Sequence, residues 1–144
     1  MYTGLLHTHH WLRYIALILL LISIVKAIAD LKHKGQNVKS KKTELFSMIS
    51  VHLQLLVGLG LFFVSDKIKL AMGDMGLAMK DPDLRLALIE HPLLMLIGII
   101  LITIGYMKLK TISDRALYGK TVLIYYGIGT LLILSRIPMY SWNL

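Results

Sequence analysis

Cysteine is absent from the sequence, which excludes disulfide bonds, thiolate metal sites and haem attached through a C-x-x-C-H motif. Any bound metal therefore needs His, carboxylate or Met ligands. Charge is also scarce, because 17% of the 144 residues are charged, against about 25% in an ordinary soluble domain. The sequence shows no Gly-rich phosphate loop and no spacing of Ser, His and acid that indicates nucleophilic catalysis. These absences exclude most soluble enzymes.

Long apolar runs dominate instead, with 56% hydrophobic residues and a mean hydropathy of +0.69. Each of four runs approaches the roughly 20 residues that cross about 30 Å of hydrocarbon. They predict helices over about 5–29, 45–65, 83–107 and 118–140. We therefore predict an all-α integral membrane protein, a single four-transmembrane-helix bundle over 1–144. The first run lacks the basic start of a cleaved secretory signal, so we expect it to be retained.

The net charge of +8 arises mainly in two of the loops between these runs. Their basic residues are Lys32, Lys34, Lys39, Lys41 and Lys42 in one loop, and Lys108, Lys110, Arg115 and Lys120 in the other. Because cytoplasmic loops carry an excess of Lys and Arg, both loops are predicted inside and both termini outside. Such loops also attract anionic lipid. The charge thus indicates topology, and we expect the lipid bilayer as partner and no nucleic acid.

Ionisable side chains within the spans are costly and normally face the bundle interior or a cofactor. They are Arg13, His52, Glu90, His91 and Arg136, with His9 and His10 near the outer rim. At a rise of about 1.5 Å per residue, Arg13, Glu90 and Arg136 lie about 7 to 10 Å outward of their span midpoints. This shared depth predicts an Arg13–Glu90–Arg136 charge network with capacity for a further anion. The alternative is that both arginines snorkel to the outer headgroups.

The histidines are candidates for haem ligation, because neutral imidazole is the usual axial ligand and bundles build cofactor sites between facing helices. His9 and His91 differ in depth by about 8 Å, whereas His52 and His91 differ by about 12 Å. We therefore predict His9 and His91 as axial ligands, with His52 in reserve. Arg13, Arg136 or His10 would meet the haem propionates, and Glu90 would orient His91 or Arg13. The alternative for each histidine is a hydrogen bond to a neighbouring helix.

Proline and glycine mark the third span. Pro92 follows His91 and predicts a kink that frees the Leu88 carbonyl. Gly98 and Gly105 follow His91 at seven-residue spacing and predict a groove without side chains. Either a flat ring or a close helix suits this groove. In the second span, a small and polar stripe suits helix packing; it consists of Ser47, Ser50, Gln54, Gly58 and Ser65.

Three segments carry a family resemblance: L-H-T-H-H-W-L-R-Y, H-L-Q-L-L-V-G-L-G-L-F-F and E-H-P-L-L-M-L-I-G-I-I-L-I-T-I-G. Over nearly the whole chain, the sequence resembles small bacterial four-helix membrane proteins labelled cytochrome b. The matching residues are His9, Arg13, His52, Gln54, Glu90, His91 and Pro92. A more distant similarity connects it to haem A synthase and copper-resistance membrane proteins. The resemblance implies haem b in the bacterial cytoplasmic membrane, but implies no reaction; the loop charges place the termini on the periplasmic side.

Three functions follow as hypotheses. The first is electron transfer through haem b, without stand-alone enzyme activity, between quinol or a partner subunit and an acceptor near the outer face; a quinone site near His52 or Tyr125 is one interpretation. The second is a copper or zinc site at the outer rim. Its ligands would be His7, His9, His10, Glu90 and His91, with Met72, Met75 and Met79 available to Cu(I). The third is a cofactor-free accessory subunit of a larger membrane complex, or a homo-oligomer.

Overall fold

The computed structural model describes residues 1–138, in which the long elements are all helices and no strand occurs. Four helices are long and apolar enough to cross a membrane. They are α1 (Tyr2–Asp30), α2 (Lys42–Val64), the continuous span Pro82–Leu109 and α7 (Arg115–Ser135). The prediction of an all-α protein with four such helices is confirmed, and the helices indicate a membrane protein.

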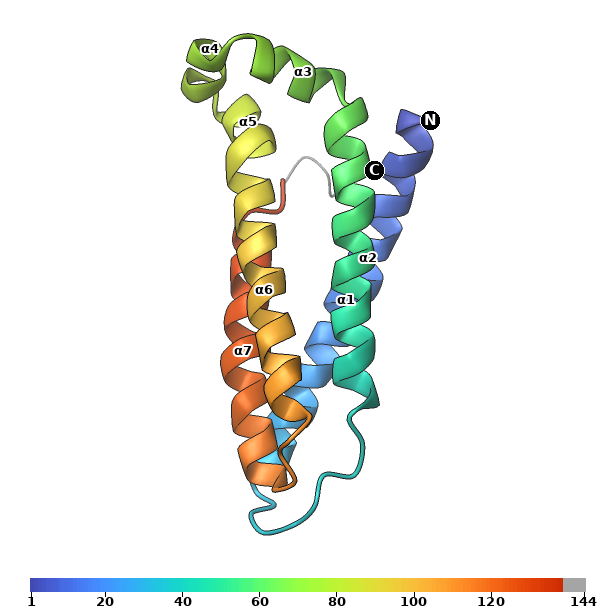
Figure 1. Ribbon diagram of the computed structural model, residues 1–144, viewed down its shortest axis with the longest axis vertical. Coiled ribbons are helices and arrows are strands. Elements are labelled where there is room, and N and C mark those ends of the chain that lie inside the picture. Colours follow the sequence, from blue (N-terminus) through green and yellow to red (C-terminus); the bar gives the residue numbers. More distant parts are fainter. Residues whose placement is uncertain (139–144) are drawn as a thin grey trace.

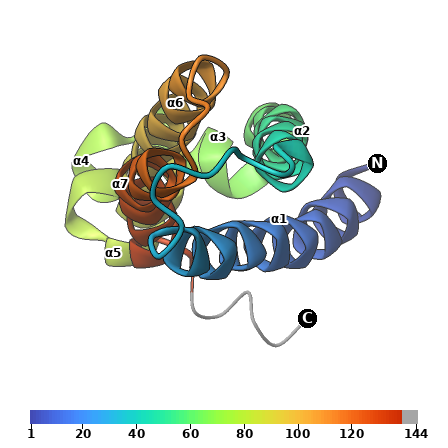
Figure 2. The same cartoon turned by 90° about the horizontal axis from the view of Figure 1, so that it is seen from below.

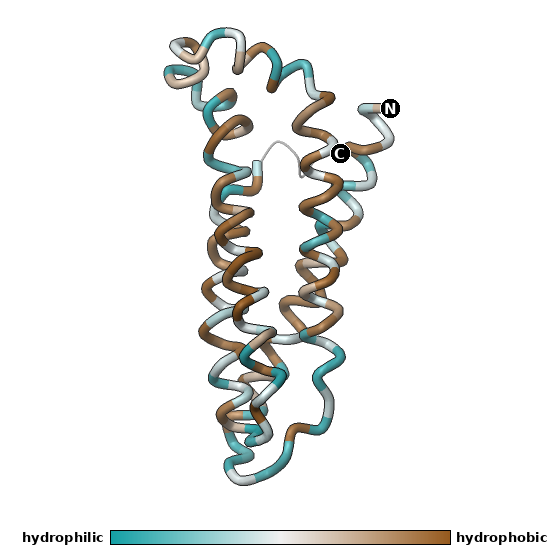
Figure 3. The backbone as a smooth tube through the Cα atoms, viewed as in Figure 1, coloured by the Kyte–Doolittle hydropathy of each residue, from teal (hydrophilic) through white to brown (hydrophobic). Residues whose placement is uncertain are grey.

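The four helices run alternately up and down and form a closed ring of neighbours (Figure 1). Within this ring α1 packs against α2 and α7, and α6 (His91–Leu109) packs against the same two helices. Figure 2 shows α1 running obliquely across the bundle. The N-terminus lies at one end with two short helices, α3 (Asp66–Gly73) and α4 (Met75–Lys80), and we call this the histidine end. The basic loops lie at the other, the loop end, where hydrophilic colour gathers in Figure 3.

The third span is interrupted by a π-helical turn. It consists of α5 (Pro82–Arg85), the π-helical turn η1 (Leu86–Glu90) and α6. The amide of His91 donates to the carbonyl of Leu86, five residues back. Pro92 has no N–H to donate to Leu88, so the regular ladder cannot continue there. The predicted local break thus takes the form of a π turn, a feature that often accompanies functional sites.

The fourth helix is shorter than predicted. It ends at Ser135, and Arg136 is its C-cap, so the expected end at residue 140 is wrong; residues 139 and 140 lie outside the described part. Pro138 explains this, because proline disfavours helical backbone at the residue before it. Arg136 therefore lies beyond the helix rather than inside it, with its side chain 47% exposed.

Burial is uneven along the bundle. In α2 the buried residues lie between Glu44 and Val51, and in α6 they begin at Gly98. None of the residues from 52 to 64 or from 85 to 97 is buried. The hydrophobic core is consequently concentrated toward the loop end. Toward the histidine end, α2 and the third span therefore do not bury residues against each other.

A glycine crossing joins α6 to α7. A Cβ atom on Gly98 would lie 2.9 Å from the carbonyl oxygen of Gly129, and a Cβ on Gly129 would lie 2.9 Å from that of Gly98. A Cβ on Gly105 would likewise collide with Tyr125. Small residues permit this close approach of two membrane helices. The predicted glycine groove is thus filled by a helix, not by a flat ring.

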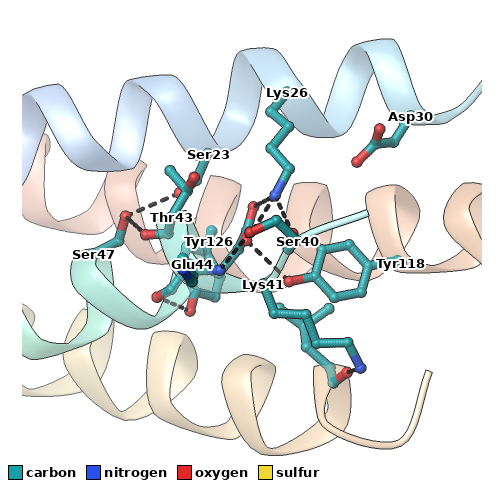
Figure 4. A network of polar contacts seen from close by, with 12 residues as sticks. Ser23, Lys26, Asp30, Ser40, Lys41, Thr43, Glu44, Ser47, Tyr118 and Tyr126 are labelled. Carbon is teal, nitrogen blue, oxygen red and sulfur yellow. Dashed lines mark hydrogen bonds and ion pairs between the residues drawn. The ribbon is translucent and has the colours of Figure 1, made fainter. Parts of the chain in front are cut away.

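A buried carboxylate ties three helices together near the loop end (Figure 4). Glu44 of α2 is fully buried, and its carboxylate accepts bonds of 3.0 Å from the Lys26 ammonium of α1 and the Tyr118 hydroxyl of α7. The Tyr126 hydroxyl donates to the Glu44 backbone carbonyl at 2.8 Å. A carboxylate in such surroundings is stable only when it is paired and hydrogen-bonded. In the sequence, Glu44 stands directly before the predicted span 45–65, and nothing in the pattern pointed to these partners.

The two basic loops are joined through Asp114. Its carboxylate caps α7 by accepting the Leu117 amide at 2.9 Å, and it accepts the Gly35 amide of the other loop at 2.6 Å. These two amides lower the pKa of Asp114. Because the pKa is lowered in the folded state, the stabilisation is present at neutral pH and is lost as the pH falls through that pKa.

Two further contacts reinforce the loop end. The Lys41 ammonium donates to the carbonyl of Leu109 at 2.8 Å, where α6 ends, which is a favourable place for a cation. Asp30 at the end of α1 is buried and pairs with Arg115 of α7 at 2.6 Å. Some of the loop charge therefore has structural partners in addition to its value for topology.

We predict that Gly98→Ala destabilises the protein by about 1 to 3 kcal/mol, because the new methyl group must displace the backbone of α7. Gly127→Ala is the matched control. Nothing lies within 4 Å of a Cβ at Gly127, and alanine favours a helix, so no loss is expected there. Unfolding of the purified protein in detergent, followed by helical circular dichroism during denaturant titration, measures both. Equal destabilisation of the two variants would contradict the glycine crossing.

We predict that Glu44→Gln lowers the free energy of unfolding by about 2 kcal/mol, because Lys26 loses its carboxylate partner. The loss stays below that of a fully buried pair because the Lys26 side chain is 27% exposed. Asp66→Asn, which removes an exposed pair with Lys69, serves as control and should have no measurable effect. The same titration compares them, and an unchanged Glu44→Gln variant would contradict the role of the network.

Candidate cofactor site

His9 of α1 and His91 at the start of α6 lie beside each other at the histidine end, with their rings in an edge-on, T-shaped arrangement. Their ring centroids are 6.4 Å apart, and the ring planes are inclined by 75°. The two residues predicted as an axial pair are therefore brought together, although straight helices counted from the span midpoints separate them by about 8 Å. The oblique course of α1 in Figure 2 explains why depth along the chain was a poor guide.

His91 is held by the segment that follows α7. Its Nδ1 lies 2.8 Å from the carbonyl oxygen of Arg136. A carbonyl only accepts, so Nδ1 carries the proton, and Nε2 of the neutral ring presents a lone pair. Metal-binding histidines usually donate their second ring nitrogen to a carbonyl or carboxylate in this manner. His91 thus has the tautomer of a ligand.

His9 lies in a cradle on α2. A Cβ atom on Gly58 would lie 3.2 Å from Cε1 of His9, so a larger residue at Gly58 would press on the ring. One turn earlier on α2, Gln54 donates its amide to the backbone carbonyl of His9 at 2.9 Å. Within residues 1–138, the buried atoms His9 Nδ1 and Gln54 Oε1 have no hydrogen-bond partner. Such atoms are rare and costly, so each calls for an explanation, such as a bound water, ion or ligand.

The charge network around Glu90 differs from the prediction in one member. Glu90 pairs with Arg85 at 2.8 Å and with Arg136 at 3.2 Å. Arg85, which stands before the predicted third span, takes the place predicted for Arg13. Arg85 precedes Glu90 by five residues across the π turn, a spacing that this turn brings onto one face. The network still contains two cations and one acid, as expected.

Arg13 belongs to a separate cluster on α1. It is buried, and its Nη2 lies 3.3 Å from Nδ1 of the buried His10 and 3.2 Å from the hydroxyl of Tyr14. The guanidinium also covers the Tyr14 ring at 4.8 Å. Because Arg13 is buried, it does not snorkel to the headgroups. The partly exposed side chain of Arg136 is compatible with snorkelling.

His52 stands apart from the pair. Its Nδ1 lies 2.8 Å from the carbonyl of Met48 in its own helix, and its Nε2 lies 3.4 Å from the Thr103 hydroxyl of α6. Along α2 it is about 9 Å from Gly58, the residue that touches His9. The contacts of His52 therefore agree with the alternative to haem ligation, in which a histidine only makes hydrogen bonds within the bundle.

A discrete copper or zinc site is not assembled here. Among residues 1–138, no three His, Asp or Glu side chains gather closely enough to hold a metal ion. His7 is exposed, His10 is engaged with Arg13, and Glu90 is engaged with two arginines. Two imidazoles alone are fewer ligands than a structural or catalytic zinc needs. The three methionines of the outer segment, Met72, Met75 and Met79, are each exposed.

No family model, curated protein or solved structure matches the chain. The case for a function therefore depends on the geometry above. The predicted neighbours His9 and His91 do lie close together, but Arg85, Gln54 and Gly58 were not among the predicted site residues. For Gln54 and Gly58 a signal existed, because they are four residues apart on one face of α2.

We predict that His91 carries its proton on Nδ1, because Nδ1 donates to the Arg136 carbonyl. Nitrogen-15 NMR of histidine-labelled protein, prepared without added haem, should show Nε2 of His91 unprotonated at neutral pH. The exposed His7 is the internal control, since its ring has no such fixed partner. A proton on Nε2 of His91 would contradict this geometry.

Proposed function

We propose that this chain binds haem b in the bacterial cytoplasmic membrane and passes single electrons between a donor in the membrane and an acceptor near the histidine end. The separation of the His9 and His91 ring centroids, 6.4 Å, carries the proposal. His9 and His91 would be the residues that hold the haem iron, because neutral imidazole is its usual protein ligand and the two rings lie close together.

Supporting features lie on both sides of the pair. The Arg136 carbonyl holds the His91 proton on Nδ1, which leaves its Nε2 available. The absence of a side chain at Gly58 lets the His9 ring lie against α2, and Gln54 holds the backbone that carries the ring. No residue from 52 to 64 or from 85 to 97 is buried, so apolar side chains there are available to cover a flat ring. When bound, haem iron would supply one-electron redox chemistry.

The charged residues suit the acidic edge of such a ring. Arg85 and Arg136 together exceed the charge of Glu90 by one, and Arg13 adds a buried guanidinium beside His10. Guanidinium groups bind carboxylates with strong, charge-assisted hydrogen bonds. We assign the propionates to these arginines, and we assign Glu90 to holding Arg136, whose carbonyl orients His91.

The proposed orientation places the loop end in the cytoplasm and the termini in the periplasm. Both Lys-rich loops lie at one end of the bundle, while the short helices α3 and α4 lie at the other (Figure 1). Basic residues are retained on the cytoplasmic side of membrane proteins. Under this assignment the histidine pair lies toward the outer face, and the acceptor is reached from there.

We predict that protein expressed with ample haem shows a reduced b-type absorption band and a positive pyridine haemochrome assay. His9→Ala and His91→Ala should each abolish the band, because each removes an axial ligand. His52→Ala is the matched control and should retain it, since His52 bonds only within α2 and to Thr103. Haem-to-protein ratios of the purified variants provide the measurement.

Three results would count against the proposal. A wild-type protein that stays colourless, with folded His9 and His91 variants that only assemble less well, would indicate a cofactor-free accessory subunit. Loss of the band in His52→Ala alone would show that His52 is a ligand and that the proposed His9–His91 pair is wrong. Metal analysis that finds copper or zinc without iron porphyrin would favour the rim metal site instead.

A further inference from the structure

A second polar site lies in a groove between α2 and α6, away from the histidine pair. The groove has a volume of about 250 Å³ and is lined by Met48, Ile49, His52, Leu53, Leu56 and Thr103. Its apolar walls are open, because Ile49, Leu53 and Leu56 are 41%, 46% and 65% exposed. In a membrane these side chains face hydrocarbon. His52 and Thr103 are thus the polar pair in the lining of a groove that opens toward lipid.

The hydrogen bonds of His52 and Thr103 use both of their donor hydrogens, so the pair presents acceptors to the groove and no donor. His52 Nδ1 lies 2.8 Å from the Met48 carbonyl, so it carries the ring proton and Nε2 is an acceptor. The Thr103 hydroxyl donates its proton to the Ile99 carbonyl at 2.7 Å. The same hydroxyl hydrogen could instead bond His52 Nε2 across 3.4 Å, but the Ile99 carbonyl at 2.7 Å is the stronger partner, and with that bond made Thr103 Oγ1 and His52 Nε2 both present lone pairs. A polar donor that enters the groove would satisfy both atoms.

We infer that this groove binds the head group of a membrane quinol and prefers the reduced quinol to the oxidised quinone. A quinol combines a flat apolar ring with hydroxyl donors, whereas a quinone presents carbonyl oxygens, which only accept. The inference rests on the proposed function in one respect, since a quinol is the membrane donor that an electron-transfer protein requires. It concerns binding alone, at His52 and Thr103.

The position of the groove agrees with that assignment. His52 is six residues, or about 9 Å, along α2 from Gly58, against which His9 lies. The other predicted quinone neighbour, Tyr125, packs at Gly105 and does not line the groove. The structure therefore favours His52 over Tyr125 as the contact.

The test compares decylhydroquinone with decylbenzoquinone, which differ by two hydrogen atoms. Equilibrium dialysis against purified protein in nanodiscs, under anaerobic conditions, measures the dissociation constant of each. We expect the hydroquinone to bind about tenfold more tightly, a difference of about 1.4 kcal/mol and the size of one hydrogen bond. His52→Leu should abolish the preference, and Thr103→Val, which keeps the side-chain shape, should reduce it. His7→Leu is the control and should leave it unchanged.

Each outcome bears on the inference separately from the haem proposal. Equal or tighter binding of the benzoquinone, or a preference that survives in folded His52→Leu protein, would overturn it. Binding of decanol as tight as that of the hydroquinone would assign the groove to a lipid-like alcohol and would also overturn it. Absorption spectra of the same samples report haem independently: a b-type band without quinol preference refutes only the groove, and a preference without the band refutes only haem binding.

Discussion

The buried carboxylate of Glu44 is the contact on which the rest of the structure depends. It joins α1 through Lys26 and α7 through Tyr118, while Tyr126 holds the adjacent backbone. An acid in an apolar bundle is tolerated only when such partners are present, and their geometry fixes how three helices meet. With the loop end closed in this way, the histidine end can stay open without loss of the fold.

The histidine end contains unpartnered polar atoms and an irregular helical turn, features that a tightly packed core disfavours. His9 and Gln54 each keep a buried polar atom without a partner within residues 1–138, and the third span is interrupted by a π turn just before His91. Deviations of this kind reduce stability and persist where a site needs them. The close approach of α6 and α7 at the glycine crossing also contributes to the histidine end. It positions α7 so that the Arg136 carbonyl contacts His91.

Much of the fold could be predicted from the sequence because the four apolar runs have the length that hydrocarbon demands. The end of α7 was wrong because the effect of Pro138 on the helix was overlooked. The His9–His91 pair was found through chemistry, since few residue types justify their cost in a membrane. The contact between Arg85 and Glu90 could not be predicted because it requires a π turn. The role of Glu44 could not be predicted because its tyrosine partners are far away in the sequence.

The central claim is that His9 and His91 are axial ligands of one iron. Electron paramagnetic resonance of the oxidised, haem-loaded protein tests it most directly, because the signal reports the axial ligands and the angle between their planes. With ring planes inclined by 75°, the account predicts a strongly anisotropic low-spin ferric signal that disappears in both His9→Ala and His91→Ala. A high-spin signal in the unaltered protein, or a low-spin signal that survives both substitutions, would contradict it.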